Sequence, residues 1–137
     1  VVVAYAALAN RGKIFQPQVV KKIIDSEKNT VQETAPKIIK IIPAKANNTE
    51  VVRQGMKQGV TSPQGSSFIL NFLPVSAAAK TGTAQTGKEE VYHNWVAVFA
   101  PYDDPQIVLV VLIENVSGVQ AAALPVAQEV LNWYFSP

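Results

Sequence analysis

The spacing of apolar residues along the chain predicts three helices. Residues 1–10 are almost wholly apolar and stop before Gly12, a residue suited to the left-handed turn that closes a helix. In residues 47–60 apolar side chains recur four apart, as on one helix face; they are Val52, Met56 and Val60, and the possible capping residues are Asn47, Asn48 and Thr49. A third helix is predicted over 119–135, packing through its alanines, Val126, Val130 and Leu131, with Pro125 in its first turn.

Shorter apolar runs in the first half of the chain predict a hairpin and two irregular segments. Residues 18–25 and 30–34 are predicted to be strands around the turn Ser26-Glu27-Lys28-Asn29. Residues 36–43 are expected to cross the domain irregularly, with their apolar side chains held against its body. Residues 62–74 are expected to form a loop around one buried apolar group, made of Phe68, Ile69, Leu70 and Phe72.

The second half of the chain has the clearest strand patterns, over 75–85, 93–101 and 106–115. The last two are joined by the tight connection Pro101-Tyr102-Asp103-Asp104-Pro105, which favours an antiparallel hairpin. Residues 107–113 are apolar at every position, so this strand is expected to be covered on both faces. Together these elements predict an α+β fold, with an antiparallel sheet flanked by helices.

Composition narrows the possible functions. The chain has 137 residues, 48% of them hydrophobic, which is enough to form one globular domain or part of one. Its net charge is only +2 and no basic stripe with interleaved aromatic residues occurs, so no nucleic-acid partner is expected. There is no cysteine and His93 is the only histidine, which excludes disulfides and the usual thiolate or histidine zinc sites.

One polar segment, Lys80-Thr81-Gly82-Thr83, directly follows three alanines on a predicted strand. Strand alternation places Thr81 and Thr83 on one face, and Lys80 and Gly82 on the other. Two hydroxyl groups beside a lysine suit an anionic ligand, and Gly82 would let another backbone come close. A free strand edge could also pair with an extended peptide, and a backbone N–H there could stabilise an oxyanion. By themselves, however, such residues on a strand more often have only a structural role.

Residues close to this segment are secondary candidates. Gln85 and Thr86 follow it and could contact a substrate. His93 begins the next predicted strand and could line the rim of a cleft, although a lone histidine more often makes a structural hydrogen bond. Trp95 and Phe99 share one face of that strand and are expected to belong to the core rather than to a substrate platform.

Several segments accompany AAAKTGTAQ in a recognisable order. They are AYAALANRGKIFQPQVVKKI and VVRQGMKQGV before it, and HNWVAVFAPYDDP and VQAAALPVAQEVLNWYF after it. With them, essentially the whole chain resembles the penicillin-binding transpeptidases of bacterial cell-wall synthesis, and most closely the class B, penicillin-binding protein 2-like enzymes. These enzymes and the serine β-lactamases share three motifs, S-x-x-K, S-x-N and K-T-G, of which the third is Lys80-Thr81-Gly82 here.

The other two motifs are absent. None of the seven serines is followed by lysine three positions later or by asparagine two positions later. In the family both motifs precede the K-T-G strand, and this chain also begins inside a predicted helix that has no capping residue before it. We therefore expect residues 1–137 to be the C-terminal part of one transpeptidase domain, whose nucleophile lies upstream.

The resemblance implies a serine D,D-transpeptidase that cross-links peptidoglycan stem peptides through an acyl-enzyme and binds β-lactams. It implies that Lys80, Thr81 and Thr83 bind the substrate carboxylate, with Gln85 nearby. The N–H of Thr83 would form half of the oxyanion hole. Gly82 belongs to the same implied catalytic segment, Lys80-Thr81-Gly82-Thr83. No metal or organic cofactor is needed. The expected partners are the rest of the same domain and other cell-wall synthesis proteins. The expected location is the outer side of the bacterial inner membrane, with the anchor outside this segment.

Two alternatives remain open at the level of sequence. A β-lactamase or a β-lactam sensor shares the same fold and the same K-T-G motif. A non-catalytic peptide-binding or structural module is the second alternative, because the chain contains no recognisable nucleophile. Rapid hydrolysis of an acyl-enzyme would indicate the first of these, and failure to form any covalent adduct would indicate the second.

Overall fold

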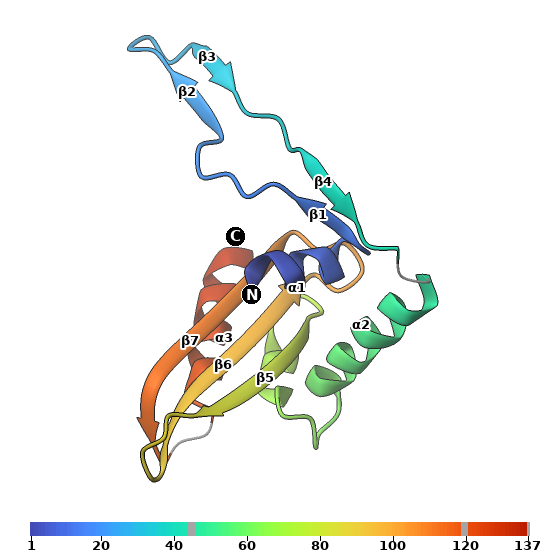
Figure 1. The fold of residues 1–137 in the computed structure, drawn as a ribbon, viewed down its shortest axis with the longest axis vertical. Coiled ribbons are helices and arrows are strands. Elements are labelled where there is room, and N and C mark those ends of the chain that lie inside the picture. Colours follow the sequence, from blue (N-terminus) through green and yellow to red (C-terminus); the bar gives the residue numbers. More distant parts are fainter. Residues whose placement is uncertain (44–45, 119–120, 137) are drawn as a thin grey trace.

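The computed structural model describes residues 1–43, 46–118 and 121–136, which form a sheet flanked by helices and a projecting β-ribbon (Figure 1). In chain order the elements are α1 (Val2–Ala9), β1 (Lys13–Phe15), β2 (Lys22–Ile24), β3 (Thr30–Glu33), β4 (Ile38–Ile41), α2 (Ala46–Thr61), the 3-10 helix η1 (Phe68–Phe72), β5 (Ala78–Gln85), β6 (Val91–Ala100), β7 (Ile107–Ser117) and α3 (Ala123–Phe135). This arrangement confirms the predicted α+β fold.

The main sheet is an antiparallel meander in the order β5-β6-β7. Its central strand, β6, is almost wholly buried from Val96 onward, because it has a hydrogen-bonded neighbour on each side and a helix against each face. The connection 101–105 joins β6 to β7, as the sequence predicts. In the part of the chain that the structure describes, β5 pairs on one side only and is therefore an edge strand.

Helices cover both faces of this sheet, and each face has its own core. On one face Leu124, Ala127 and Leu131 of α3 pack against Val96 and Val98 of β6. The other core combines side chains from α1, α2 and the sheet, namely Ala9, Met56, Ala78, Phe99 and Tyr102. Burial of each large apolar side chain contributes about 1.5–3 kcal/mol, so these two layers fix the position of the sheet.

Strand β7 is covered less completely than the sequence predicts. Both α1 and α3 contact it, so each face has a helix as expected. The residues from Ile107 to Val111 nevertheless remain half-buried, and Leu112 is exposed. Within the described ranges of the chain, β7 is an outer strand of the meander and pairs with β6 alone, so one of its sides has no neighbouring strand (Figure 1).

Three other predicted core residues lie at the surface. Val126 and Val130 are exposed because α3 meets the sheet through Leu124, Ala127 and Leu131, which occupy a different helix face. Phe72 is 68% exposed and packs edge-to-face on the half-buried Phe68. Of the apolar group predicted around η1, Leu70 is fully buried and Ile69 packs against the core.

Helix α2 begins earlier than predicted. It starts at Ala46, so Asn47, Asn48 and Thr49 lie within the helix, and the prediction that one of them caps it is wrong. Met56 and Val60 are buried as expected, but Val52 is 48% exposed. The helix ends at Thr61, directly before Ser62 and Pro63.

A long β-ribbon, here called the arm (residues 13–43), projects from the body next to α1 (Figure 1). Its base is the antiparallel pair β1–β4 and its outer part is the antiparallel pair β2–β3. The hairpin around 26–29 is therefore confirmed, whereas β1 was not predicted and residues 38–41 are a strand rather than an irregular crossing. The apolar residues of this stretch are exposed, not held against the body; they are Ile38, Ile39, Ile41 and Ile42.

A fully buried arginine joins three elements of the body. The Arg53 guanidinium donates hydrogen bonds to the carbonyl oxygens of Leu8 (3.1 Å), Ala9 (2.5 Å) and Tyr102 (2.6 Å). It also lies over the rings of Phe99 and Tyr102, at 4.8 and 5.0 Å from their centroids. Arg53 thus links α2 to the C-terminal end of α1 and to the β6–β7 connection, because it donates to carbonyl oxygens in both.

Candidate functional site

The Lys80-Thr81-Gly82-Thr83 segment lies in the middle of β5, on the edge of the sheet. Lys80 pairs with Ala97 and Gly82 with Trp95, whereas Thr81 pairs with Val96 and Thr83 with Asn94. Because directly paired residues of antiparallel strands share a face, the predicted alternation is confirmed. Lys80 and Thr83 are exposed, while Thr81 and Gly82 are half-buried.

Lys80 supplies a positive charge that the described residues do not neutralise. Its Nζ donates a hydrogen bond to the carbonyl oxygen of Thr81 at 2.6 Å, and no carboxylate of a described residue lies within ion-pair distance of it. Beside it a hollow of about 290 Å³ opens on the same face of the sheet, with an otherwise largely apolar lining that includes Tyr5, Trp95 and Val110. A cation next to a partly apolar hollow is suited to an anionic group carried by an organic ligand.

Gly82 is not required by packing within the described residues. A β-carbon at this position would stand 3.5 Å from the β-carbon of Trp95, which is an ordinary contact. Its backbone does not have a positive φ either. With no side chain at Gly82, another backbone could come close to β5 on its unpaired side.

Thr81 has a partner that the sequence did not indicate. Its hydroxyl and that of Ser66 share a hydrogen bond of 2.9 Å, and Ser66 comes from the loop between α2 and η1. The two residues are fifteen positions apart, so no local pattern signals the contact. Three hydroxyl groups, those of Ser66, Thr81 and Thr83, thus belong to this part of the sheet edge.

The secondary candidates have different positions. Gln85 is exposed at the end of β5. Thr86 lies in the following turn, where its hydroxyl donates to the carbonyl oxygen of Val91 at 2.8 Å. His93 is opposite Ala84 in the register, and its Nδ1 accepts a hydrogen bond from the backbone N–H of Asn115 at 3.2 Å. His93 therefore has a structural hydrogen bond between β6 and β7.

The two aromatic residues of β6 behave differently. Phe99 is fully buried in the core on the α1 face, as predicted. Trp95 is only half-buried and lines the hollow beside Lys80. It is paired with Gly82 and is a member of neither core. The expectation that Trp95 belongs to the core is therefore wrong.

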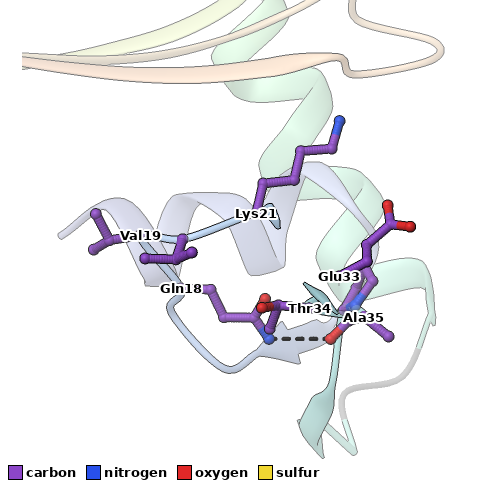
Figure 2. A pocket seen from close by; sticks show the side chains of 8 residues that line it. Gln18, Val19, Lys21, Glu33, Thr34 and Ala35 are labelled. Carbon is purple, nitrogen blue, oxygen red and sulfur yellow. Dashed lines mark hydrogen bonds between the residues drawn. The ribbon is translucent and has the colours of Figure 1, made fainter. Parts of the chain in front are cut away.

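A second hollow lies on the arm, far from β5 in the sequence and in space (Figures 1 and 2). Its volume is about 600 Å³. It opens between the two antiparallel segments of the arm, where they are unpaired between the β1–β4 pair and the β2–β3 pair. The side chain of Gln18 bridges it through a hydrogen bond from Nε2 to the carbonyl oxygen of Ala35 at 3.1 Å (Figure 2). Its lining is almost entirely solvent-exposed, with Lys21 and Glu33 as its only charged residues, so it offers no arrangement for catalysis.

A family model places these observations in context. Residues 1–135 match the penicillin-binding protein transpeptidase domain. The chain therefore belongs to the penicillin-binding transpeptidase family, as its K-T-G strand and mixed fold indicate. This confirms the family that the sequence resembles.

Within this family, the curated relatives include peptidoglycan D,D-transpeptidases. The chain is 27% identical to the peptidoglycan D,D-transpeptidase MrdA of Haemophilus influenzae, over 97% of this chain and 23% of that protein. It is 31% identical to the stage V sporulation protein D of Bacillus subtilis, over 85% of this chain and 19% of that protein. The chain thus spans about a quarter or less of the length of these relatives.

Solved structures of penicillin-binding proteins have the same fold. Penicillin-binding protein 2B of Streptococcus pneumoniae superposes with a TM-score of 0.81 at 24% identity, covering 95% of this chain and 23% of that one. Penicillin-binding protein 2 of Pseudomonas aeruginosa, solved in complex with WCK 5153, gives 0.73 at 28% identity, covering 96% and 28%. These agree with the class B, penicillin-binding protein 2-like assignment.

Proposed function

We propose that this chain is the C-terminal part of the transpeptidase domain of a peptidoglycan D,D-transpeptidase, and that it supplies the carboxylate-binding wall of the active site. The observation that carries the proposal is the uncompensated Lys80 ammonium beside the hydroxyls of Thr81 and Thr83 on an unpaired sheet edge. The family match over residues 1–135 and the absence of an S-x-x-K motif support a division of the site between this chain and the rest of the domain.

The proposed reaction transfers an acyl group in two steps. A serine from the rest of the domain loses its proton to a base and attacks the carbonyl carbon of the penultimate D-alanine in a D-alanyl-D-alanine peptide. The C–N bond breaks, the terminal D-alanine leaves as an amine after accepting a proton, and an ester joins peptide and enzyme. An amine of a neighbouring stem peptide then attacks the ester, forms the cross-link and releases the serine. This division replaces one difficult step by two easier ones.

The residues of β5 have separate roles in this scheme. Lys80 provides the positive potential that holds the terminal carboxylate, and the hydroxyls of Thr81 and Thr83 donate hydrogen bonds to it. The backbone N–H of Thr83 stabilises the oxyanion that develops on the attacked carbonyl, an interaction whose loss typically costs about 2.7–4 kcal/mol of barrier. Gln85, at the exposed end of the strand, contacts the more distant part of the peptide.

The same wall would bind β-lactams, which carry a carboxylate and a reactive amide at a similar separation. Among the structural relatives, penicillin-binding protein A of Mycobacterium tuberculosis has been solved as an imipenem acyl-enzyme complex. The peptidoglycan transpeptidases among the relatives favour cross-linking over the β-lactamase alternative. The acyl-enzyme formed with a β-lactam should therefore be long-lived rather than rapidly hydrolysed.

The proposed location is the outer side of the inner membrane, with an anchor supplied by another part of the protein. Among the described residues, no helix has both the length and the apolar character needed to span a bilayer. The proposed partners are the remaining part of the domain, the stem peptide and other proteins of cell-wall synthesis. Membrane fractionation of cells that produce the tagged protein tests this location.

The first test is intact-protein mass spectrometry after incubation with benzylpenicillin, on this chain and on the longer protein that contains it. We expect one adduct on the longer protein, at a serine outside residues 1–137, and none on this chain alone. No adduct on either protein would reject the proposal and support the non-catalytic alternative. An adduct on one of the seven serines of this chain would reject the proposed division of the site.

The second test is Lys80→Ala in the longer protein. We expect the second-order rate of acylation by benzylpenicillin to fall by about a hundredfold or more, because a charge-assisted contact to the carboxylate is lost. The thermal midpoint should not change, since the Lys80 side chain is exposed. The matched control is Lys88→Ala, an exposed lysine of the β5–β6 turn, which should acylate at the normal rate. A normal rate for Lys80→Ala would remove Lys80 from the site.

A further inference from the structure

Among the described residues, Ser66 is the one whose side chain hydrogen-bonds to the hydroxyl of Thr81. We propose that Ser66 is a positioning residue of the K-T-G strand, which orients the Thr81 hydroxyl as a donor toward the substrate carboxylate. This inference rests on the proposed function of β5. Ser66 belongs to a different element and is not part of the K-T-G motif.

The loop that carries Ser66 is held firmly on α2. The backbone N–H of Ser67 donates to the carbonyl oxygen of Gly59 at 3.0 Å, and that of Gly65 donates to the carbonyl oxygen of Ser62 at 2.8 Å. Ser67 itself is fully buried. Ser66 lies between these two anchored residues, so its position follows from the backbone on either side of it.

Glycines allow this loop, α2 and β5 to come close together. A β-carbon at Gly65 would stand 2.8 Å from the carbonyl carbon of Gly59 and 2.9 Å from the carbonyl oxygen of Ser62, too close for any other residue without a shift of the backbone. A β-carbon at Gly59 would stand 3.4 Å from the carbonyl oxygen of Ala79, two residues before Thr81. The close approach at Gly59 and Gly65 brings Ser66 within hydrogen-bond distance of β5.

The chemistry of two linked hydroxyls gives the contact a direction once a carboxylate is bound. A hydroxyl can donate one hydrogen bond and accept two, whereas an ionised carboxylate only accepts. When the Thr81 hydroxyl donates a hydrogen bond to the carboxylate, its oxygen can accept a hydrogen bond from the Ser66 hydroxyl. Ser66 thereby fixes the rotation of the Thr81 hydroxyl and strengthens it as a donor, since hydrogen bonds in a chain polarise one another.

The test compares Ser66→Ala with wild type in the longer protein, using benzylpenicillin and its methyl ester. We expect acylation by benzylpenicillin to slow by about fivefold to tenfold, the worth of one net hydrogen bond. Acylation by the ester should change by less than about twofold, because the ester lacks the anionic group that needs the oriented donor. Ser66→Thr, which keeps the hydroxyl, should acylate at nearly the normal rate.

A double-mutant cycle with Thr81→Val separates positioning from a general structural effect. If Ser66 acts through Thr81, Ser66→Ala should cause no further loss in the Thr81→Val background. The matched control is Ser62→Ala, in the same loop, whose hydroxyl hydrogen-bonds only to Gln64 and should not affect acylation. The thermal midpoints of all variants are measured to confirm that they fold.

Three results would overturn the inference. They are a normal rate for Ser66→Ala with benzylpenicillin, an equal loss with the acid and the ester, and additive losses in the cycle. Failure of the proposed function itself looks different, because the wild-type protein would then form no adduct at all.

Discussion

Arg53 shows how much of this structure depends on one side chain. A guanidinium is rarely buried completely, and here it is 0% exposed. Its hydrogen bonds to three carbonyl oxygens compensate for its lost hydration, and the Glu50 carboxylate lies 3.5 Å from its Nε without a hydrogen bond. Nothing in the sequence indicates this role, since Arg53 is an ordinary polar residue of an amphipathic helix.

Replacement of Arg53 by methionine should destabilise the domain by about 3–5 kcal/mol, because it leaves buried carbonyls without donors. Urea unfolding of the longer protein measures this change. The matched control is Arg11→Met, whose side chain is 67% exposed and lies 4.0 Å from the same Glu50 carboxylate. That variant should lose less than about 1 kcal/mol. Equal losses in the two variants would contradict the structural role assigned to Arg53.

Tyr102 makes stability depend on pH in the alkaline range. Burial raises the pKa of its phenol above the usual value, and so does the hydrogen bond that the phenol donates to Glu50 at 2.8 Å. A raised pKa means that the folded state holds the proton more tightly than the unfolded state does. The stability from the buried phenol is therefore complete below about pH 10, the ordinary pKa of tyrosine, and is lost as the pH rises through the raised value.

Thermal unfolding of wild type and Tyr102→Phe between pH 8 and pH 11 tests this dependence. The variant should have the lower midpoint at pH 8, because it lacks the hydrogen bond to Glu50. The difference between the two midpoints should then shrink above about pH 10. A constant difference across this range would show that the phenol does not contribute to the alkaline loss.

At the scale of elements, the glycines near α2 have opposite roles. A β-carbon at Gly55, inside α2, would have no atom within 4 Å, whereas one at Gly65 would be in close contact with Gly59 and Ser62. Gly55→Ala should therefore stabilise the domain by about 0.5–1 kcal/mol through helix propensity alone. Gly65→Ala should destabilise it and slow acylation, because the loop that carries Ser66 must move.

Urea unfolding and the acylation rate of both glycine variants provide the measurement. Gly55→Ala serves as the matched control, since the substitution is identical and only the surroundings differ. If Gly65→Ala were as stable and as reactive as wild type, the close contact between the loop and α2 would not be needed.

The sequence predicted the elements whose packing is local and missed those whose pairing is distant. Strands β5, β6 and β7 follow one another through short connections, so their own patterns were sufficient. The pair β1–β4 joins residues on either side of a hairpin, and Pro36 and Pro43 flank β4 like the boundaries of a loop. Its isoleucines suggested burial because large apolar side chains usually avoid water.

For the candidate site too, the sequence predicted the local strand geometry but not the contacts with distant residues. Alternation along one strand was enough to place Lys80 and Thr81 on opposite faces, which the register confirms. The contact between Ser66 and Thr81 depends on how a loop folds back on α2, and no periodic pattern records that path. Trp95 was assigned to the core because the sequence does not show that the hollow beside Lys80 lies next to it.

At the scale of the whole molecule, the body and the arm differ in how they are stabilised. The body has two cores, one on each face of the sheet. In the described residues, β2 and β3 make their substantial contacts only with each other, and their apolar side chains Ile23, Ile24 and Val31 are exposed. The outer arm therefore adds little to the stability of the body.

Limited digestion with trypsin should show this difference. We expect the first cuts at the arm lysines, which lie on weakly held backbone: Lys21, Lys22 and Lys28. Lys80 is also exposed but belongs to a hydrogen-bonded strand of the main sheet, so cleavage there should come much later. Peptide mass spectrometry over time identifies the order of cuts, and early cleavage within β5 would contradict this account.

The meander of β5, β6 and β7 also bears on how the site could fail to form. Side chains alternate along a strand, so a shift of β5 by one residue against β6 would exchange the faces of Lys80 and Thr81. The ammonium would then point where the hydroxyls belong, in a sheet that still had most of its backbone hydrogen bonds. Because the strands are joined by short connections, the correct pairing closes small loops and is kinetically favoured. The two short turns of the meander thus favour the pairing that keeps the ammonium and the hydroxyls on their own faces of the sheet edge.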